Sequence, residues 1–378
     1  MSDDAEWTGM GAGAWPWPVL VREPVEPVET LLEAERADAA RRHTGVAVRG
    51  PLFGVAANSE SDGLRWRVVI AVNAGCPQLA RDSLNSLFWF RAKDEAKDRA
   101  ERRALLAAVA RLETERVDEL TVLGTRYRVV RAEEYARVDA HGRIEAPRPT
   151  DPVPRVISWN RADRGPEIDE GLVVDPEAPV SPLQAAERLG MRSLAYTAKK
   201  FPRQVREDSA RAVESHPDVV MMPAAFLVVE KAGKGNWTPS SGLHATAHDA
   251  RKSLDFSFTW MEPRRRGLIP FDTDPHADAR SIVAENSSEK AGELAAYVAA
   301  SDRLREGVVD EIELHGTVYR IGRSRRLLRW GPDGPEGPRP SDVNSQDPMA
   351  MHPHMDEDGV IHRESSGSDS GEDDSDDD

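Results

Sequence analysis

The chain has 378 residues, with 50 basic and 66 acidic side chains and a formal charge of −16, which is enough for two domains that each bury a core. With 39% hydrophobic and 31% charged residues, the composition excludes a membrane protein and a wholly disordered chain. The single cysteine, Cys76, excludes an intramolecular disulfide and fits a reducing compartment, so we expect a cytoplasmic protein.

Residues 1–29 are expected to form an N-terminal extension. Acidic residues at positions 3, 4 and 6 stand where a secretory signal would carry positive charge, so we expect no such signal. Trp15 and Trp17 alternate with prolines in this extension. We interpret this isolated aromatic pair as an anchor for a neighbouring surface or for a partner.

An internal repeat is the strongest feature of the sequence. Residues 117–131 match residues 309–323 without a gap, and eight of the 15 pairs are identical. The motif PRPTD at 147–151 recurs as PRPSD at 338–342, and residues 43–55 resemble residues 216–228. We therefore predict a tandem duplication. Its parts are repeat unit 1 (30–145), a proline-rich connector (146–182) and repeat unit 2 (183–342).

Each unit is predicted to be an α+β fold, a small antiparallel sheet of about four strands covered by helices. Strict alternation at 65–72 predicts a strand with four residues on one face: Trp66, Val68, Ile70 and Val72. Residues 78–116 have a helical composition, with an apolar seam at Leu105, Val109 and Leu112. Prolines at 263 and 270 interrupt the corresponding region of unit 2, so two or more helices are expected there.

The last hairpin of each unit carries a register prediction. A type II′ turn at Gly124 and Thr125 would place residue 122 opposite 127 and Asp118 opposite Arg131. Leu120, Val122, Tyr127 and Val129 would then share one face. The same assumption for Gly316 and Thr317 aligns Ile312, Leu314, Tyr319 and Ile321, with Asp310 opposite Arg323.

The connector and the C-terminus have distinctive compositions. Eight prolines between residues 146 and 182 indicate an extended segment, and Ser181 with Pro182 is typical of a helix start. Residues 343–378 are predicted to be a disordered acidic tail, because residues 356–378 hold 11 carboxylates and one basic side chain. This charge would repel phosphates, so nucleic acid is not expected as a partner. No stretch approaches about 18 consecutive apolar residues, so no membrane contact is expected either.

No motif assigns a reaction. The sequence has no phosphate-binding loop, nucleophile elbow or dinucleotide fingerprint, so no cofactor, no metal site and no catalytic residue is predicted. His244 and His248 have the spacing of a helical metal pair, but a helix that starts at Thr246 would leave His244 in a loop. His352 and His354 beside the acidic tail are interpreted as flexible, solvated residues.

Other candidates also have structural interpretations. Glu119 and Glu311 recur at equivalent strand positions, where ion pairs with Arg128 and Arg320 are favoured over paired acid–base catalysis. Cys76 is interpreted as a buried or idle thiol rather than a nucleophile. Four tryptophans at repeat-equivalent positions are expected to pack in the core: Trp66, Trp237, Trp89 and Trp260.

Three segments carry a resemblance to a known family. They are FWFRAKDEAK at 88–97, ALLAAVARLETERVDEL at 104–120 and GPDGPEGPRPSD at 331–342. The sequence resembles an actinobacterial family known only as a domain of unknown function, over about residues 30–342. The resemblance implies a bacterial cytoplasmic setting and supplies no reaction, ligand or catalytic residue.

The leading hypothesis is a non-enzymatic binding or scaffold protein with a duplicated recognition surface, acting on an unknown protein partner. The alternative is an enzyme with a pocket between the two units. A weaker alternative is a regulator that acts through its acidic tail. A cleft with convergent, partly buried charged groups would favour the enzyme, whereas a broad exposed apolar patch would favour the binding protein.

Overall fold

The computed structural model describes residues 18–285 and 289–362. Trp15, Trp17 and the acidic residues after 362 lie outside these ranges. In the described part, no helix is both long and apolar enough to cross a membrane.

The first half of the chain forms four helices and five strands in the order α, β, β, α, α, β, β, β, α. They are α1 (Pro27–Arg42), β1 (Gly45–Ser59), β2 (Trp66–Ala74), α2 (Pro77–Asp94), α3 (Arg99–Thr114), β3 (Glu119–Val122), β4 (Thr125–Val138), β5 (Val173–Val174) and α4 (Pro182–Met191), with a short 3₁₀ turn (Glu60–Asp62) between β1 and β2.

The second half follows a similar order. Its elements are α5 (Arg203–Ser215), β6 (Asp218–Met221), β7 (Ala225–Ala232), β8 (Thr238–Pro239), α6 (Ala247–Phe256), a π-helical turn (Ser257–Met261), α7 (Glu262–Arg265), α8 (Ala279–Glu285), α9 (Glu289–Glu306), β9 (Glu311–Leu314), β10 (Thr317–Gly331), β11 (Gly334–Pro335), β12 (His354–Met355) and β13 (Ile361–His362). The expectation of two or more helices in this half is confirmed.

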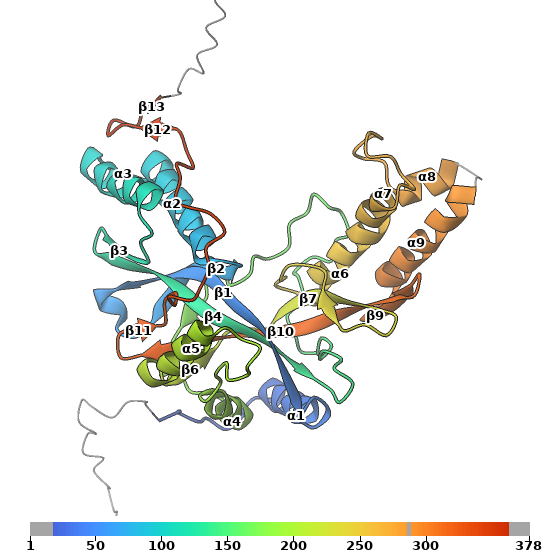
Figure 1. Cartoon of the computed structure of the whole chain (residues 1–378), viewed down its shortest axis with the longest axis horizontal. Coiled ribbons are helices and arrows are strands. Elements are labelled where there is room, and N and C mark those ends of the chain that lie inside the picture. Colours follow the sequence, from blue (N-terminus) through green and yellow to red (C-terminus); the bar gives the residue numbers. More distant parts are fainter. Residues whose placement is uncertain (1–17, 286–288, 363–378) are drawn as a thin grey trace, which may run out of the picture.

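One large antiparallel sheet runs through the molecule. Its main path is β5-β2-β1-β4-β10-β7-β8, and β3, β6, β9 and β11 pair with β4 or β10. The two small sheets expected from the sequence are therefore joined, because β4 and β10 pair directly through Glu134 and Arg326 and their neighbours. Figure 1 shows α2 and α3 at one end of the sheet, α6 to α9 at the other, and α1, α4 and α5 along one side.

The two ends of the sheet have separate cores. In the first, α2 and α3 pack on β1, β3 and β4, and the seam residues Leu105, Val109 and Leu112 are buried as predicted. In the second, α6 and α9 pack on β7, β9 and β10. A third cluster contains Val130, Ala132, Leu328 and Trp330, so it lies where β4 and β10 meet. Burial of apolar surface at this junction ties the two ends into one body.

Helix starts follow the local sequence. Ser181 caps α4 as predicted, since its hydroxyl accepts from the Gln184 N–H and Pro182 takes the first helical position. Thr246 caps α6 in the same way, with its hydroxyl accepting from the Asp249 N–H. His244 therefore lies before this helix, as expected.

Strand β2 departs from the predicted alternation. Trp66, Val68 and Val72 join the third cluster, but Ile70 packs against the first core. The register explains the difference, because Val55 pairs with Ile70 while the next residue, Ala56, pairs with Val68. This step inserts an extra residue in β2 and turns Ile70 to the other face. A second register shift lies between Val55 and Phe53, and Val72, opposite that shift, again joins the third cluster.

Both hairpins turn one residue earlier than predicted. Val122 pairs with Thr125 and Leu314 with Thr317, so the turns are Leu123-Gly124 and His315-Gly316. All four turn residues have positive φ, from 50° to 76°, as a type I′ turn requires. The resulting register differs by two residues from the prediction, which preserves the predicted apolar faces and changes the partners.

The predicted cross-strand charge pairs are wrong for this reason. Asp118 lies opposite Val129, whose N–H donates to its carbonyl, and the Asp118 carboxylate accepts instead from Arg81. Asp310 likewise bonds to the Ile321 N–H through its carbonyl and to Arg251 through its carboxylate.

The boundary of the predicted tail is also wrong. Residues 343–362, here called the C-terminal segment, contain β12 and β13 and run along α2 and α3 (Figure 1). Met355 is 3% exposed and belongs to the first core. Trp89 donates to the Pro353 carbonyl over 3.1 Å. The acidic run after residue 362 lies outside the described residues.

Candidate functional site

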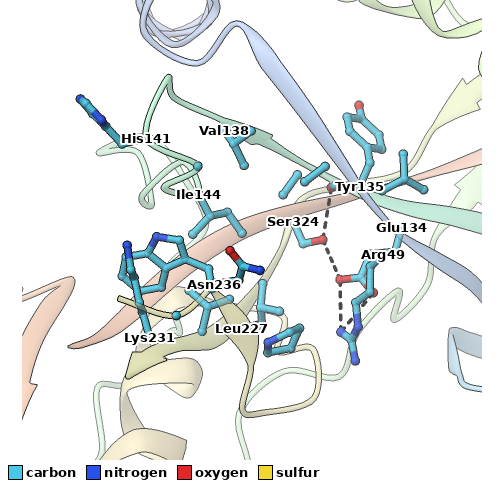
Figure 2. Close-up of a pocket in the computed structure, with 18 residues that line it drawn as sticks. Arg49, Glu134, Tyr135, Val138, His141, Ile144, Leu227, Lys231, Asn236 and Ser324 are labelled. Carbon is cyan, nitrogen blue, oxygen red and sulfur yellow. Dashed lines mark hydrogen bonds and ion pairs between the residues drawn. The ribbon is translucent and has the colours of Figure 1, made fainter. Parts of the chain in front are cut away.

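A cavity of about 380 Å³ lies where the two ends of the sheet meet (Figure 2). Strands β1 and β4 supply one wall, and β7, β8 and β10 supply the other. Its lining is mostly aliphatic and aromatic, with a charged group at one end. This volume and composition are typical of a small-molecule pocket.

The wall from β4 is formed mainly by side chains at alternate positions, and Tyr135 between them also lines the cavity. Glu134, Ala136 and Val138 line the cavity, since every second residue of a strand points to the same side. The chain then turns back, and Ile144 pairs with Val138 across the turn. The Asp139 carboxylate closes that turn by accepting from the N–H groups of His141 and Arg143.

The charge on Asp139 is fixed by the same turn. Burial alone would raise its pKa, but backbone and side-chain hydrogen bonds from Arg143 and a backbone bond from His141 lower the pKa to about 2. The turn therefore keeps its shape at neutral pH. It holds His141 at the exposed rim and Ile144 against the wall.

A chain of three polar side chains forms the charged end. Ser324 on β10 donates to Glu134 Oε1 over 2.9 Å, and the Arg49 Nη1 atom lies 3.2 Å from Glu134 Oε2 (Figure 2). Glu134 is 2% exposed, whereas the Arg49 side chain is 43% exposed. Glu134 Oε2 accepts no hydrogen bond from the described residues. One buried acceptor and one accessible donor group thus stand side by side.

The opposite end is aromatic. Trp237 lies beside Lys231, whose ammonium is 5.9 Å from the ring centroid. The indole Nε1 is buried and has no hydrogen-bond partner among the described residues. A buried indole N–H normally finds an acceptor, so this group offers a second polar contact to a bound molecule.

The polar groups of the cavity are engaged with one another. Ser324 is 1% exposed, and its single hydroxyl proton is directed to Glu134, with the Tyr135 carbonyl as the more distant acceptor at 3.3 Å. The Glu134 carboxylate is held by Arg49. In the described part of the chain, no group of three or more His, Cys, Asp or Glu residues is arranged to hold a metal ion.

The histidines singled out in the sequence lie in separate environments. His248 Nε2 lies 3.0 Å from the Ser158 carbonyl, and burial lowers the pKa of His244. His352 stacks on Trp89 with ring centroids 4.6 Å apart. The expectation that His352 is flexible and solvated is therefore wrong, because the C-terminal segment is part of the fold.

The recurring glutamates form ion pairs, as favoured. Glu119 Oε2 accepts from Arg128 Nε over 2.7 Å, and Glu311 Oε2 accepts from Arg320 Nη1 over 2.6 Å. Burial alone would raise the pKa of Glu119, but hydrogen bonds from Arg126 and Arg128 hold it below its usual range. Neither glutamate lines the cavity.

Cys76 is buried directly before the first helical residue of α2, and its sulfur lies 3.2 Å from the Ser345 hydroxyl. Burial would raise the pKa of the thiol, but hydrogen bonds from Ser345 and from the start of α2 outweigh it and lower the pKa. Among the repeated tryptophans, Trp66 and Trp89 are buried as predicted. Trp237 instead lines the cavity, and Trp260 is only half-buried.

Residues 26–345 match a family that is described only as a family of unknown function, DUF5954. The chain belongs to this family. The resemblance inferred from the sequence is thereby confirmed at the level of a domain of unknown function, and the actinobacterial setting stays a prediction. Searches of curated proteins and of solved structures gave no match. The family match ends at residue 345, so Met355 lies beyond it.

Sequence reasoning missed the main residues of this cavity, Arg49, Glu134 and Ser324. They come from three strands that are far apart in the chain, and none belongs to a recognisable motif. One signal was available: Glu134 and Ser324 are polar residues inside long strands whose neighbours are buried.

Proposed function

We propose that the chain is a tandem duplication of one α+β unit and that it acts as a non-enzymatic binding protein. Contacts that recur in both halves support the duplication. The Phe88 ring meets Tyr127 edge to face with centroids 4.9 Å apart, and Phe258 meets Tyr319 in the same way at 5.0 Å. In each half the phenylalanine lies in the helical region that follows the paired strands and the tyrosine lies in the long strand, although more residues separate them in the second half.

Contacts between the halves are reciprocal. Arg131 Nε donates to Asp342 over 2.9 Å, and Arg323 Nε donates to Asp151 over 3.0 Å. Each aspartate ends a recurring proline-rich motif, and each arginine lies in the long strand of the other half. Such an exchange is what a twofold relation between two copies requires.

The strand pairing points the same way. Glu134 lies directly opposite Arg326, and the two positions are 192 residues apart, which is the offset of the sequence repeat. A twofold axis through this pair would relate β4 to β10. The unit boundaries proposed from the sequence, 30–145 and 183–342, lie on either side of the connector.

The cavity at this junction carries the binding proposal. Its decisive feature is a buried carboxylate oxygen, Glu134 Oε2, that accepts no hydrogen bond from the described residues, 3.2 Å from Nη1 of the partly exposed Arg49 and among apolar walls. A ligand that fits has a flat apolar body and one end that both donates and accepts hydrogen bonds. A primary carboxamide on an aromatic ring has this chemistry, since its NH₂ donates to Glu134 and its oxygen accepts from Arg49.

Benzamide is the probe that tests this proposal. Saturation-transfer NMR on the full chain should show contact with benzamide, and benzoate should give a weaker signal because its charge opposes Glu134. Ala47→Phe should remove the benzamide signal, because Ala47 lines the cavity. Val46→Phe is the matched control, since Val46 precedes it on β1, is 43% exposed and does not line the cavity.

Equal signals from the two variants, or stronger binding of benzoate than of benzamide, would contradict the proposed site. The cytoplasmic location remains part of the proposal, supported by the single free cysteine at position 76. An additional protein partner also remains part of the proposal. The alternative that invokes the acidic tail concerns residues 356–378, of which those after 362 lie outside the described ranges.

A further inference from the structure

A second cavity, of about 320 Å³, lies among α1, α4, β4 and β10. Four guanidinium groups line it: Arg36 from α1, Arg137 from β4, Arg148 from the loop after β4, and Arg325 from β10. Glu187 of α4 is the one carboxylate in its lining. In a chain of formal charge −16, this gathering of four cations in one small cavity needs an explanation.

The carboxylates around the cavity leave many of these donors free. Glu187 binds both Arg137 and Arg325, while Glu145 binds Arg148. A guanidinium has five N–H donors, and these contacts use only one or two on each arginine.

Arg36 shows the unmet capacity most directly. Its Nη1 atom binds Glu33 at the edge of the cavity. Its Nε atom is buried and has no hydrogen-bond partner among the described residues.

A further arginine, Arg323, lies near the lining residues Arg325 and Arg148. Arg323 is 8% exposed, and its Nη1 atom lacks a hydrogen-bond partner among the described residues. Burial first, and then the nearby charge of Arg325, lower the pKa of Arg323; Arg148 adds to this effect, and the charges of Asp151 and Glu145 oppose it only in part. A bound anion would relieve this repulsion.

The corresponding place in the other half shows what fills such a cavity. This step rests on the duplication proposed above, by which Arg325 corresponds to Glu133 and Arg137 to Arg329. There the Tyr196 hydroxyl enters and donates to Glu133, and Arg329 donates to the Arg192 carbonyl over 3.2 Å. The chain itself thus supplies a donor for the acid and acceptors for the arginine.

The charge at the key position is reversed in the arginine-lined cavity. Arg325 takes the place of Glu133 here, so a group that occupies the place of the Tyr196 hydroxyl must accept hydrogen bonds rather than donate them. Several guanidiniums that converge from different elements match an oxyanion with acceptors in several directions, which a phosphate group provides. The cavity volume exceeds what one phosphate needs and leaves room for a small attached group.

We propose that this cavity binds the phosphate group of a small phosphorylated molecule. Arg36, Arg137, Arg148 and Arg325 hold the phosphate oxygens, and Glu187 keeps Arg137 and Arg325 oriented. The site is separate from the first pocket: Tyr135, next to Glu134 on β4, directs its hydroxyl to Glu187 over 3.0 Å.

Titration calorimetry on the full chain, in a phosphate-free buffer of low ionic strength, tests the proposal. Inorganic phosphate and glycerol 3-phosphate are the two probes, and their comparison distinguishes the free ion from a phosphorylated molecule. We expect glycerol 3-phosphate to bind more tightly than phosphate. Arg36→Gln should weaken that binding about tenfold or more, the usual effect of losing one charge-assisted hydrogen bond.

Arg41→Gln is the matched control. It removes the same charge from the same helix, but the Arg41 side chain is 73% exposed and does not line the cavity. Its binding constant should stay within about twofold of the wild type. Gly190→Leu is a second variant, and it changes no charge. Gly190 is suitable because it lines the cavity and has open space at its Cβ position. This substitution should fill the cavity and abolish binding.

Absence of heat with both probes in the wild-type chain would overturn the proposal. So would equal weakening by Arg36→Gln and Arg41→Gln, which would indicate general attraction to surface charge. Unchanged binding in Gly190→Leu would place the phosphate elsewhere. The benzamide signal of the first pocket should persist in Arg36→Gln, so the failure of one site is distinguishable from failure of the other.

Discussion

The reciprocal arginine–aspartate pairs should differ in strength although their geometry is alike. Asp151→Asn and Asp342→Asn each remove one charge from a buried pair that bridges the two halves. The side chains of Arg323 and Asp151 are 9% and 8% exposed, and those of Arg131 and Asp342 are 3% and 5% exposed. Both aspartates also accept one backbone N–H, from Arg148 and Arg339 respectively.

The difference lies in what remains after the substitution. Arg131 keeps a second buried ion-pair partner, Glu133, whereas among the described residues Arg323 forms its ion pair with Asp151 alone, and the charges of Arg325 and Arg148 there oppose that of Glu145. Removing the partner of an otherwise unpaired buried charge costs about 3–5 kcal/mol. Losing one charge-assisted hydrogen bond while another partner stays costs about 1.5–3 kcal/mol. We therefore expect Asp151→Asn to be the more damaging change by about 1–2 kcal/mol.

Urea unfolding at pH 7, followed by tryptophan fluorescence, measures the two free energies of unfolding. Glu115→Gln is a suitable control, because its ion pair with Arg111 is about half exposed on both sides and should change stability by less than about 1 kcal/mol. Equal losses for the two aspartate variants, or a larger loss for Asp342→Asn, would refute the reasoning about the charges left behind.

Three further predictions concern stability. Burial would raise the pKa of Glu187, but the charges of Arg325 and Arg137 outweigh it and lower the pKa from 4.5. The Glu187 carboxylate therefore stabilises the fold fully above pH 4.5, and this contribution is lost as the pH falls through the folded-state pKa. Glu187→Gln should flatten the acid limb of a plot of unfolding free energy against pH. Met355→Ala should cost about 2–5 kcal/mol in urea unfolding if the C-terminal segment belongs to the core, and no loss would contradict this. Leu123→Asn should raise the melting temperature and add about 1 kcal/mol to the free energy of unfolding. The reason is that φ is 50° at this exposed turn residue, a conformation that asparagine adopts more easily than leucine.

Local patterns predicted the structure best where contacts are local. The seam of α3 and the start of α4 followed from spacing and capping residues alone. The hairpin turns were placed one residue late, because two-residue turns with one glycine can be type I′ or type II′ and the sequence favours both. The apolar faces were still correct, since a shift of two residues leaves each side chain on its side of the sheet.

The joined sheet and both cavities depend on contacts that a single sequence does not reveal. Glu134 and Ser324 meet because β4 pairs with β10, and no local signal specifies that pairing. The arginines of the second cavity come from four separate segments, so their spacing has no meaning along the chain. A repeat predicts that two similar units exist, but the surface by which they associate is set by tertiary packing.

If the chain is the tandem duplication proposed above, the junction also suggests why a duplicated chain would serve better here than a symmetric dimer. In a dimer of one unit, the residue on the twofold axis faces its own copy, and a glutamate there would oppose another glutamate at a destabilising distance. A duplicated gene allows the two positions to diverge, and Glu134 now faces Arg326. The same divergence at the next position gives Glu133 in one half and Arg325 in the other. One half then closes over Tyr196, and the other keeps a cavity lined by arginines. On the duplication proposed above, the loss of symmetry at the axis would create the two proposed binding sites.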